Sequence, residues 1–207
     1  MRYAMEGEDV ELVSVERRRT ERTPTPIPPP RRMLLSAPTV VLDTETTGRS
    51  KQAEVHQIAA VLLDVYGDEV DSFSGRGRPL RLNLPGIRQA LAVSHTTFAQ
   101  LRAAPPIAEV LTDFRDWWKG HGEPVCTAYN VPFDRRMLGY HGITLKWGED
   151  IMKVSKRASP GKGGLEGVAK RLEVLQQAQT HQALDDARLA AAVLVTSLQR
   201  LQQGKAA

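Results

Sequence analysis

The order of strand-like and helix-like segments is the feature that most restricts the fold of this 207-residue chain. Three β-prone runs come first, and helix-prone segments follow with one more short strand among them. The expected strands cover residues 38–44, 55–67, 69–82 and 124–129. The expected helices cover residues 86–92, 96–102, 107–119, 131–142, 164–172 and 182–202, and residues 143–163 are expected to be irregular. This order predicts an α/β fold with a mixed sheet that opens as a three-strand meander and is flanked by helices.

Apolar spacing predicts which helix faces are buried. In segment 107–119 apolar residues recur at i, i+3, i+4, i+7 and i+11, so Trp118 is expected in the core and not as a base-stacking platform. The next helix is expected to begin at an Asn130 cap with Pro132 in its first turn. Its expected inward residues are Phe133, Met137 and Tyr140. The expected stripe of the last helix is Leu184, Ala187, Ala191, Leu194, Leu198 and Leu201.

The first 32 residues differ in composition from the rest. They contain seven arginines and six acids and end in TPTPIPPPRR, where the proline density disfavours helix and sheet and favours an extended linker. The run VELVSV at residues 10–15 is a candidate short strand. We expect a flexible Arg- and Pro-rich leader over residues 1–32 and one compact domain over residues 33–207. The leader is also a candidate docking segment for a partner protein.

Bulk composition excludes several classes of protein. The longest apolar run, around residues 189–195, is far too short to cross a membrane, and the acidic N-terminus is unlike a secretory signal. We therefore expect a cytoplasmic protein without a membrane partner. The single cysteine, Cys126, excludes an intramolecular disulfide and a multi-cysteine metal site, and is expected to be a small core residue. A net charge of +4 is compatible with a polyanionic partner.

The stretch VVLDTETTG, residues 40–48, is a buried-strand pattern that ends in two acids. Alternate side chains of a strand share a face, so Asp43 and Glu45 are expected side by side while Thr44 points the other way. Two neighbouring carboxylates repel unless a cation, a base or a protonation shift offsets the repulsion. The alternative interpretation is an ordinary solvated strand end.

Further along the chain, two acids lie in the first turns of helices, where the helix dipole stabilises a charged carboxylate. They are Asp134, after the fourth strand, and Asp186, at the start of the last helix. His181 precedes Asp186 by five residues and is expected at or just before that helix. Asp185 could take the place of Asp186, although it can also be a surface charge near Arg188.

Three blocks together resemble the DEDD superfamily of 3′–5′ exonucleases in its histidine subtype (DEDDh), the group that contains polymerase III epsilon proofreading subunits and ribonuclease T. The blocks are DTETTG (43–48), AYNVPFD (128–134) and HQALDD (181–186), the last fitting H-x4-D. Weaker similarity lies in HQIAAV (56–61) and in SHTTFAQL followed by PPIAEV (94–110), where Thr96 replaces the usual glycine after His95. The resemblance covers about residues 36–200 and implies a ribonuclease H-like fold.

The resemblance implies a metal-dependent 3′–5′ exonuclease that releases nucleoside 5′-monophosphates from DNA or RNA. It implies two divalent cations. Asp43 would bridge both ions, Glu45 and Asp186 would complete the shell of the first ion, and Asp134 would hold the second. Oxygen ligands favour Mg²⁺ or Mn²⁺. His181 is the implied general base. The implied nucleotide-contacting residues are Thr46, Thr47, Gly48, His95, Asn130 and Phe133.

Residues 151–164 carry basic residues and no acid, which predicts a flexible loop that contacts phosphates of single-stranded or 3′-frayed nucleic acid. The basic residues are Lys153, Lys156, Arg157 and Lys162. Two other functions remain open. One is a proofreading subunit, active in DNA repair with a DNA polymerase that the leader over residues 1–32 could bind. The other is a catalytically silent nucleic-acid-binding module. Neither a G-x-S-x-G motif nor a complete phosphate-binding loop is found, so a serine hydrolase or an ATPase has no support.

Overall fold

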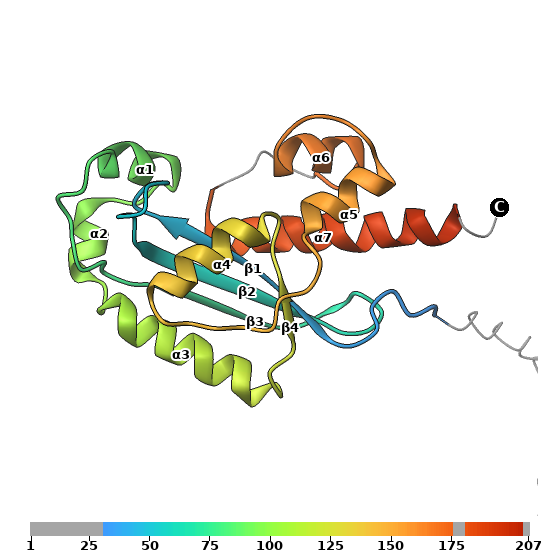
Figure 1. Ribbon diagram of the computed structural model, residues 1–207, viewed down its shortest axis with the longest axis horizontal. Coiled ribbons are helices and arrows are strands. Elements are labelled where there is room, and N and C mark those ends of the chain that lie inside the picture. Colours follow the sequence, from blue (N-terminus) through green and yellow to red (C-terminus); the bar gives the residue numbers. More distant parts are fainter. Residues whose placement is uncertain (1–30, 176–180, 205–207) are drawn as a thin grey trace, which may run out of the picture. The chain divides into compact units, whose positions relative to one another are not determined.

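A four-stranded mixed sheet lies at the centre of the fold (Figure 1). The computed structural model describes residues 31–175 and 181–204, and orders the strands β3-β2-β1-β4. The strands are β1 (Thr39–Thr46), β2 (Val55–Leu63), β3 (Glu69–Arg76) and β4 (Val125–Thr127). The first three form an antiparallel meander, and β4 pairs in parallel with the start of β1. The predicted α/β fold with a mixed sheet and an initial meander is confirmed.

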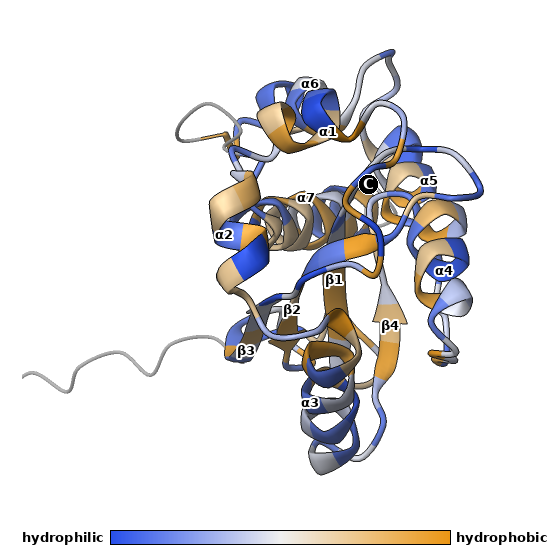
Figure 2. Cartoon of the chain, turned by 90° about the vertical axis from the view of Figure 1, so that its left-hand side faces the viewer, coloured by the Kyte–Doolittle hydropathy of each residue, from blue (hydrophilic) through white to orange (hydrophobic). Residues whose placement is uncertain are grey.

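Helices cover both faces of the sheet, because β1 sends alternate apolar side chains to opposite sides. Val40 and Leu42 join a core with α3 and α4, whereas Val41 joins a second core with α5, α6 and α7. Figure 2 shows the apolar central strands between α3 and α7. The helices are α1 (Ile87–Val93), α2 (Phe98–Ala103), α3 (Ile107–Gly120), α4 (Val131–Tyr140), α5 (Ile151–Ala158), α6 (Leu165–Arg171) and α7 (Ala183–Gln203).

The buried face of α7 consists mainly of small residues. It is formed by Ala183, Asp186, Ala187, Ala190, Ala191, Val193, Leu194 and Ser197. The expected stripe is therefore right at Ala187, Ala191 and Leu194, but Leu184, Leu198 and Leu201 lie at its margin and are only partly buried. Short side chains let the helix axis approach the sheet closely, and α7 packs against both β1 and β2.

Residues 143–163, expected to be irregular, contain the helix α5. The carboxylate of Asp150 caps this helix by accepting from the backbone N–H of Lys153, and Ile151 and Val154 are buried on its inner face. The segment is short and rich in cations. Its two buried apolar residues are too few to form an apolar stripe that the sequence alone would identify as a helix. The predicted flexible loop is wrong at Lys153, Lys156 and Arg157, which lie on α5.

The start of α4 also differs from the expectation. Asn130 occupies the N-cap position, but its side chain makes no capping hydrogen bond. Asp150 instead accepts from the backbone N–H of Val131 at 2.9 Å, so one carboxylate serves the starts of both α4 and α5. At the other end of α4, Tyr140 is 48% exposed, and Leu138 is buried beside Met137.

Other expectations concern single residues and boundaries. Trp118 and Cys126 are buried as expected, and burial raises the pKa of the Cys126 thiol to about 12. Strands β2 and β3 end earlier than expected, at Leu63 and Arg76. The candidate strand at residues 10–15 and most of the leader lie outside the described residues, so the domain boundary near residue 33 stays a prediction. Among the described helices, none has the length and apolarity needed to cross a membrane.

Candidate active site

The two acids of β1 lie where this strand extends past its short neighbour. β4 pairs only with residues 39–41 of β1, so Asp43 and Glu45 lie beyond the end of β4. Their side chains share the α7 face of the sheet with Val41, as strand alternation predicts. Both acids therefore occupy an open edge of the sheet, next to the first turns of α4 and α7.

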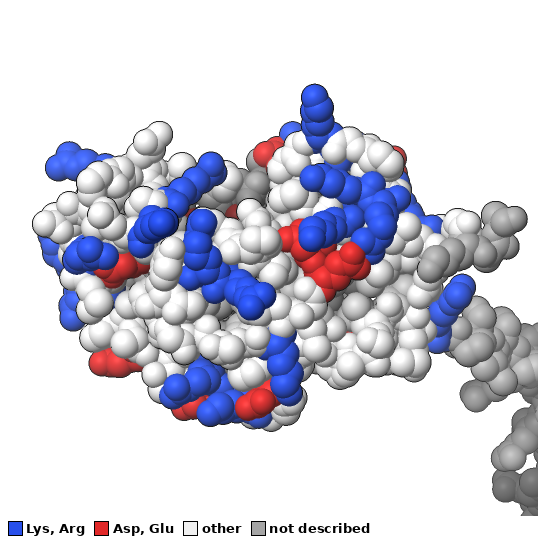
Figure 3. Space-filling view, in the orientation of Figure 1, with Lys and Arg blue, Asp and Glu red and all other residues white. Residues whose placement is uncertain are grey.

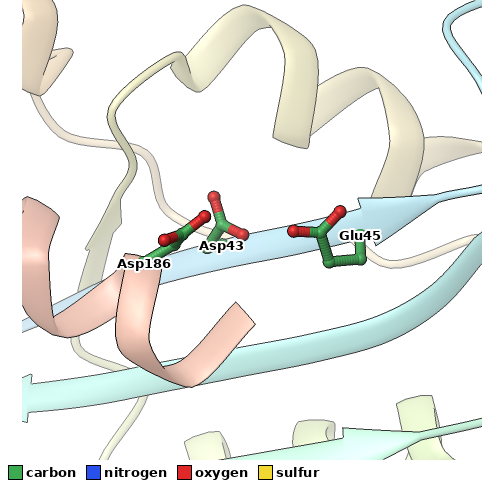
Figure 4. Close-up of side chains that lie close together, drawn as sticks. All are labelled: Asp43, Glu45 and Asp186. Carbon is green, nitrogen blue, oxygen red and sulfur yellow. The ribbon is translucent and has the colours of Figure 1, made fainter. Parts of the chain in front are cut away.

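Asp186, in the first turn of α7, completes a cluster of three carboxylates (Figure 4). Carboxylate oxygens of Asp43, Glu45 and Asp186 all lie within 4.8 Å of one another. Asp186 is buried in this cluster, whereas Asp185 is exposed on the adjacent helix position. The α7 helix thus presents Asp186 to β1, in agreement with the H-x4-D spacing.

Asp134 approaches this carboxylate cluster from the other side of the sheet. It lies in the first turn of α4 and is 4% exposed. The hydroxyl of Thr44, which leaves β1 on the face opposite to Asp43, donates to Asp134 Oδ1 at 2.8 Å. This bond joins α4 to β1 at the level of the carboxylate cluster.

Burial and mutual repulsion raise the pKa values of these acids. The pKa of Asp43 lies well above its usual range, because the carboxyl is buried and faces Asp134, Glu45 and Asp186. Burial, followed by the charges of Asp186 and Asp134, raises the pKa of Glu45 to about 8. Burial raises the pKa of Asp134 to about 7, although the hydrogen bond from Thr44 opposes this shift.

Such a site fits hard divalent cations. Four acids in one place cannot all be charged near neutral pH without positive charge between them. Their ligand atoms are all carboxylate oxygens, which suit Mg²⁺ or Mn²⁺ better than softer metals. The carboxylate cluster is therefore a candidate metal centre.

His181 lies at the rim of the cluster, immediately before α7. Its side chain is 42% exposed, and Nδ1 is 3.8 Å from Asp186 Oδ2. Its backbone has a positive φ of 52°, which is uncommon for a residue other than glycine. This backbone turn lets the imidazole reach the hollow beside Glu45 instead of joining the buried face of α7.

A hollow of about 520 Å³ opens beside the cluster. Of the residues expected to contact nucleotide, four line it: Thr46, Gly48, Asn130 and Phe133. Thr47 instead is 1% exposed and bonds to the backbone of Glu54 through its own N–H and hydroxyl. His95 is exposed in the turn between α1 and α2 and does not line the hollow.

Sequence reasoning missed several residues at this site. Arg49, Ala90 and Val93 also line the hollow, and Val93 is 50% exposed. Arg49 directly follows the DTETTG block, so its position was available from the sequence, whereas Ala90 and Val93 reach the hollow only through the packing of α1.

Basic side chains gather over α5, and also over α1 and α2 (Figure 3). Lys153 and Lys156 lie on α5, and both are exposed to solvent. Arg157 forms an ion pair with Glu149 through both ends of its guanidinium. The charge of Arg157 is thus partly offset within the protein.

Comparisons with known proteins agree with this geometry. The Exonuclease (RNase T) family model matches residues 40–194, and the chain belongs to this exonuclease family. DNA polymerase III PolC-type of Staphylococcus epidermidis is 30% identical over 98% of this chain, and that of Staphylococcus aureus is 30% identical over 83%. The chain spans only 14% and 12% of the length of these relatives.

Solved structures share the fold. The nuclease domain of 3′hExo, described as a DEDDh family member bound to rAMP, has a TM-score of 0.64 at 18% identity and covers 81% of this chain and 92% of that domain. Exonuclease I of E. coli in complex with a dA16 oligonucleotide has a TM-score of 0.64 at 17% identity, over 81% of this chain and 42% of that one. The expected membership in an exonuclease family and the expected ribonuclease H-like fold are confirmed.

Proposed function

We propose that this domain hydrolyses the terminal phosphodiester at the 3′ end of a single-stranded or frayed nucleic acid and releases a nucleoside 5′-monophosphate. The observation that carries the proposal is the meeting of Asp43, Glu45 and Asp186, with Asp134 held beside them by Thr44, at a hollow that His181 also lines. Family membership supports a divalent metal requirement. Two Mg²⁺ or Mn²⁺ ions are the finer proposal, because four carboxylates can share them.

Each residue has a proposed task. Asp43 would contact both cations, Glu45 and Asp186 would complete the shell of one, and Asp134 would hold the other. When bound, the cations would offset the charge of the phosphate and make water a better nucleophile. His181 would accept the proton of the attacking water, since its imidazole lines the hollow beside Glu45 and is 42% exposed.

The terminal nucleoside would occupy the hollow, where Thr46, Gly48, Asn130 and Phe133 contribute lining. The volume of about 520 Å³ suits one nucleotide better than a duplex end. The lysines of α5 would contact phosphates further along the strand. Thr47 would act indirectly, by fixing the turn after β1 against Glu54.

A Mg²⁺-dependent digestion of 5′-end-labelled DNA and RNA oligonucleotides tests the proposal. The wild-type chain should shorten one or both from the 3′ end, whereas Asp43→Ala should lose at least about 10²-fold of the rate. His181→Ala should lower turnover about 10²-fold or more while metal and oligonucleotide binding persist. Asp113→Ala, which removes an exposed acid of α3, is the matched control.

The acids of α7 offer a sharper comparison. Asp186→Ala should abolish activity because this carboxylate belongs to the cluster, whereas Asp185→Ala should retain most of it. The reverse result would show that the register of α7 is misassigned. A chain that binds oligonucleotide but cleaves neither DNA nor RNA would instead support the silent binding module.

A proofreading role is a second proposal, favoured by the similarity to PolC-type polymerases. The leader, outside the described residues, is the proposed docking segment. Co-purification of the full chain with a replicative polymerase would support this role, and loss of the complex on deletion of residues 1–30 would assign it to the leader.

A further inference from the structure

Two histidines of this chain hold an uncommon backbone conformation. His95 has φ of 48° and His181 has φ of 52°, both in the left-handed region that residues with a side chain rarely adopt. Such conformations persist only where surrounding contacts hold them. His181 is the proposed general base, so the contacts that hold its segment bear on catalysis.

The side chain of Gln182 joins the segments that carry these histidines. Its Nε2 donates to the backbone carbonyl of Ser94 at 2.7 Å, directly before His95. The same nitrogen is 3.5 Å from the carbonyl oxygen of His181. Its Oε1 accepts from Arg76 at 3.2 Å, at the end of β3. We call these contacts, made by Gln182 to Ser94 and Arg76, the Gln182 bridge.

An ordinary helix-capping role does not explain these contacts. Gln182 occupies the N-cap position of α7, yet its side chain makes no capping hydrogen bond to the helix. Its amide instead forms hydrogen bonds with Ser94 and Arg76, which lie 88 and 106 positions away in the chain.

Both ends of the bridge are firmly placed. Ser94 is fully buried, with its hydroxyl near Thr96 and His56. Arg76 lies opposite Gln57 on β2, which in turn lies opposite Glu45 on β1. Directly paired residues share a face, so Arg76 belongs to the same row of the sheet as the catalytic Glu45.

We propose that Gln182 is a positioning residue that holds His181 against the rim of the carboxylate cluster and couples it to the Ser94–His95 turn. This inference rests on the proposed function for its catalytic consequence, because His181 acts as base only there. The geometric part stands independently, since it concerns where two histidine segments are held. Arg76 orients the amide so that its N–H faces Ser94.

Histidine resonances test the geometric part without any catalytic assay. The full chain, labelled at histidine Cε1, contains five histidines, and single His→Ala variants assign His181 and His95. Gln182→Ala should shift both resonances and leave those of His121 and His141 in place. Gln199→Ala, an exposed glutamine on the same helix, should shift none. Unchanged His181 and His95 resonances in Gln182→Ala would overturn the proposal.

Three further variants separate the contact of Gln182 with Ser94 from its contact with Arg76. Gln182→Glu can still accept from Arg76 but cannot donate to Ser94, so it should shift His95 as Gln182→Ala does. Arg76→Lys keeps one donor and should stay closer to wild type than Arg76→Met. Equal effects of the two Arg76 variants would remove Arg76 from the bridge.

Kinetics test the catalytic part. Gln182→Ala should lower kcat at least about tenfold, with KM within about twofold, because general-base catalysis is worth 10²-fold or more when the base is aligned. In a His181→Ala background the same change should cost nothing further. Equal losses in both backgrounds would overturn the positioning role. A wild-type chain without nuclease activity would refute the proposed function, while the histidine resonances would still decide whether the bridge exists.

Discussion

Asp43 and Thr44 are neighbours on β1 whose side chains leave on opposite faces, and yet both serve the same site. Asp43 enters the carboxylate cluster directly, whereas Thr44 reaches it by bonding to Asp134. This arrangement works because β4 is short, which leaves the edge of β1 open to α4 at this level. One strand thereby supplies proposed metal ligands on one face and support for another proposed ligand on the other.

Replacing Thr44 with Val should weaken metal binding without removing a ligand. The Thr44 hydroxyl stabilises the charged form of Asp134, so its loss should raise the pKa of Asp134 further. At neutral pH the site would then need a higher Mg²⁺ concentration to reach half of its maximal rate. Loss of this buried hydrogen bond should also cost about 1 kcal/mol of stability.

Mg²⁺ titration of the hydrolysis rate, with chemical denaturation alongside, measures both effects. Thr39→Val is the matched control, since the Thr39 hydroxyl bonds only to the nearby carbonyl of Ala37 at the surface. An unchanged Mg²⁺ requirement in Thr44→Val would contradict the role of this hydrogen bond.

At the scale of elements, Asp150 connects α4 and α5, the helices on either side of the loop that follows α4. It accepts from the N–H of Val131 at the start of α4 and from that of Lys153 in α5. Asp134 lies one turn into α4, so Asp150 supports the helix that carries a proposed metal ligand. α5 in turn packs against α7.

Asp150→Ala should destabilise the protein by roughly 2–3 kcal/mol, since it removes a helix cap and leaves the buried N–H of Val131 unbonded. It should also lower activity by shifting Asp134. Asp150→Asn, which keeps one acceptor, should lose less on both counts. Urea unfolding and the hydrolysis rate measure the two effects, and a fully stable Asp150→Ala would show that other groups start these helices.

The cations of α5 give a prediction about substrate binding. Each contact to a phosphate of a single strand contributes about 0.7 to the slope of log affinity against log salt concentration. Lys153→Ala/Lys156→Ala should therefore reduce this slope by about 1.4. The charge-matched control Arg115→Ala/Lys119→Ala, on the exposed side of α3, should leave the slope unchanged. A similar loss in both double variants would indicate only a general charge effect.

For the whole molecule, the metal-free site makes stability depend on pH. The pKa of Glu45 is about 8 in the folded chain, against an ordinary value of 4.5, and that of Asp134 is about 7 against 3.8. The folded state therefore binds more protons than the unfolded state within this range. Stability should consequently fall as pH rises from about 4 to about 8.

Divalent cations should reverse this trend, because they favour the charged carboxylates of the folded state. Thermal unfolding from pH 4.5 to 8.5 with EDTA, and again with Mg²⁺, checks the prediction. Glu45→Gln should reduce the fall seen with EDTA. A melting temperature that rises with pH in EDTA would contradict the raised pKa values.

The sequence predicted the parts of this molecule that local patterns encode. The meander, the stripe that buries Trp118, and the placement of Asp43, Glu45, Asp134 and Asp186 near helix and strand ends all follow from spacing. Prediction from the sequence failed where contacts between distant segments determine the structure. Tyr140 is exposed because the core beneath α4 ends at Leu138, and α5 forms because Asp150 caps it and α7 receives its two apolar residues. The bond from Thr44 to Asp134 spans 90 positions and has no local pattern.

The alanine-rich inner face of α7 has a consequence for how this family can vary. Aspartate is a short side chain, so Asp186 meets the acids of β1 only while Ala183, Ala187 and Ala190 keep the helix backbone near the sheet. A single added methyl group on that face would push the helix away from the sheet. The chain could remain folded and keep every acid, and still hold them too far apart to share an ion.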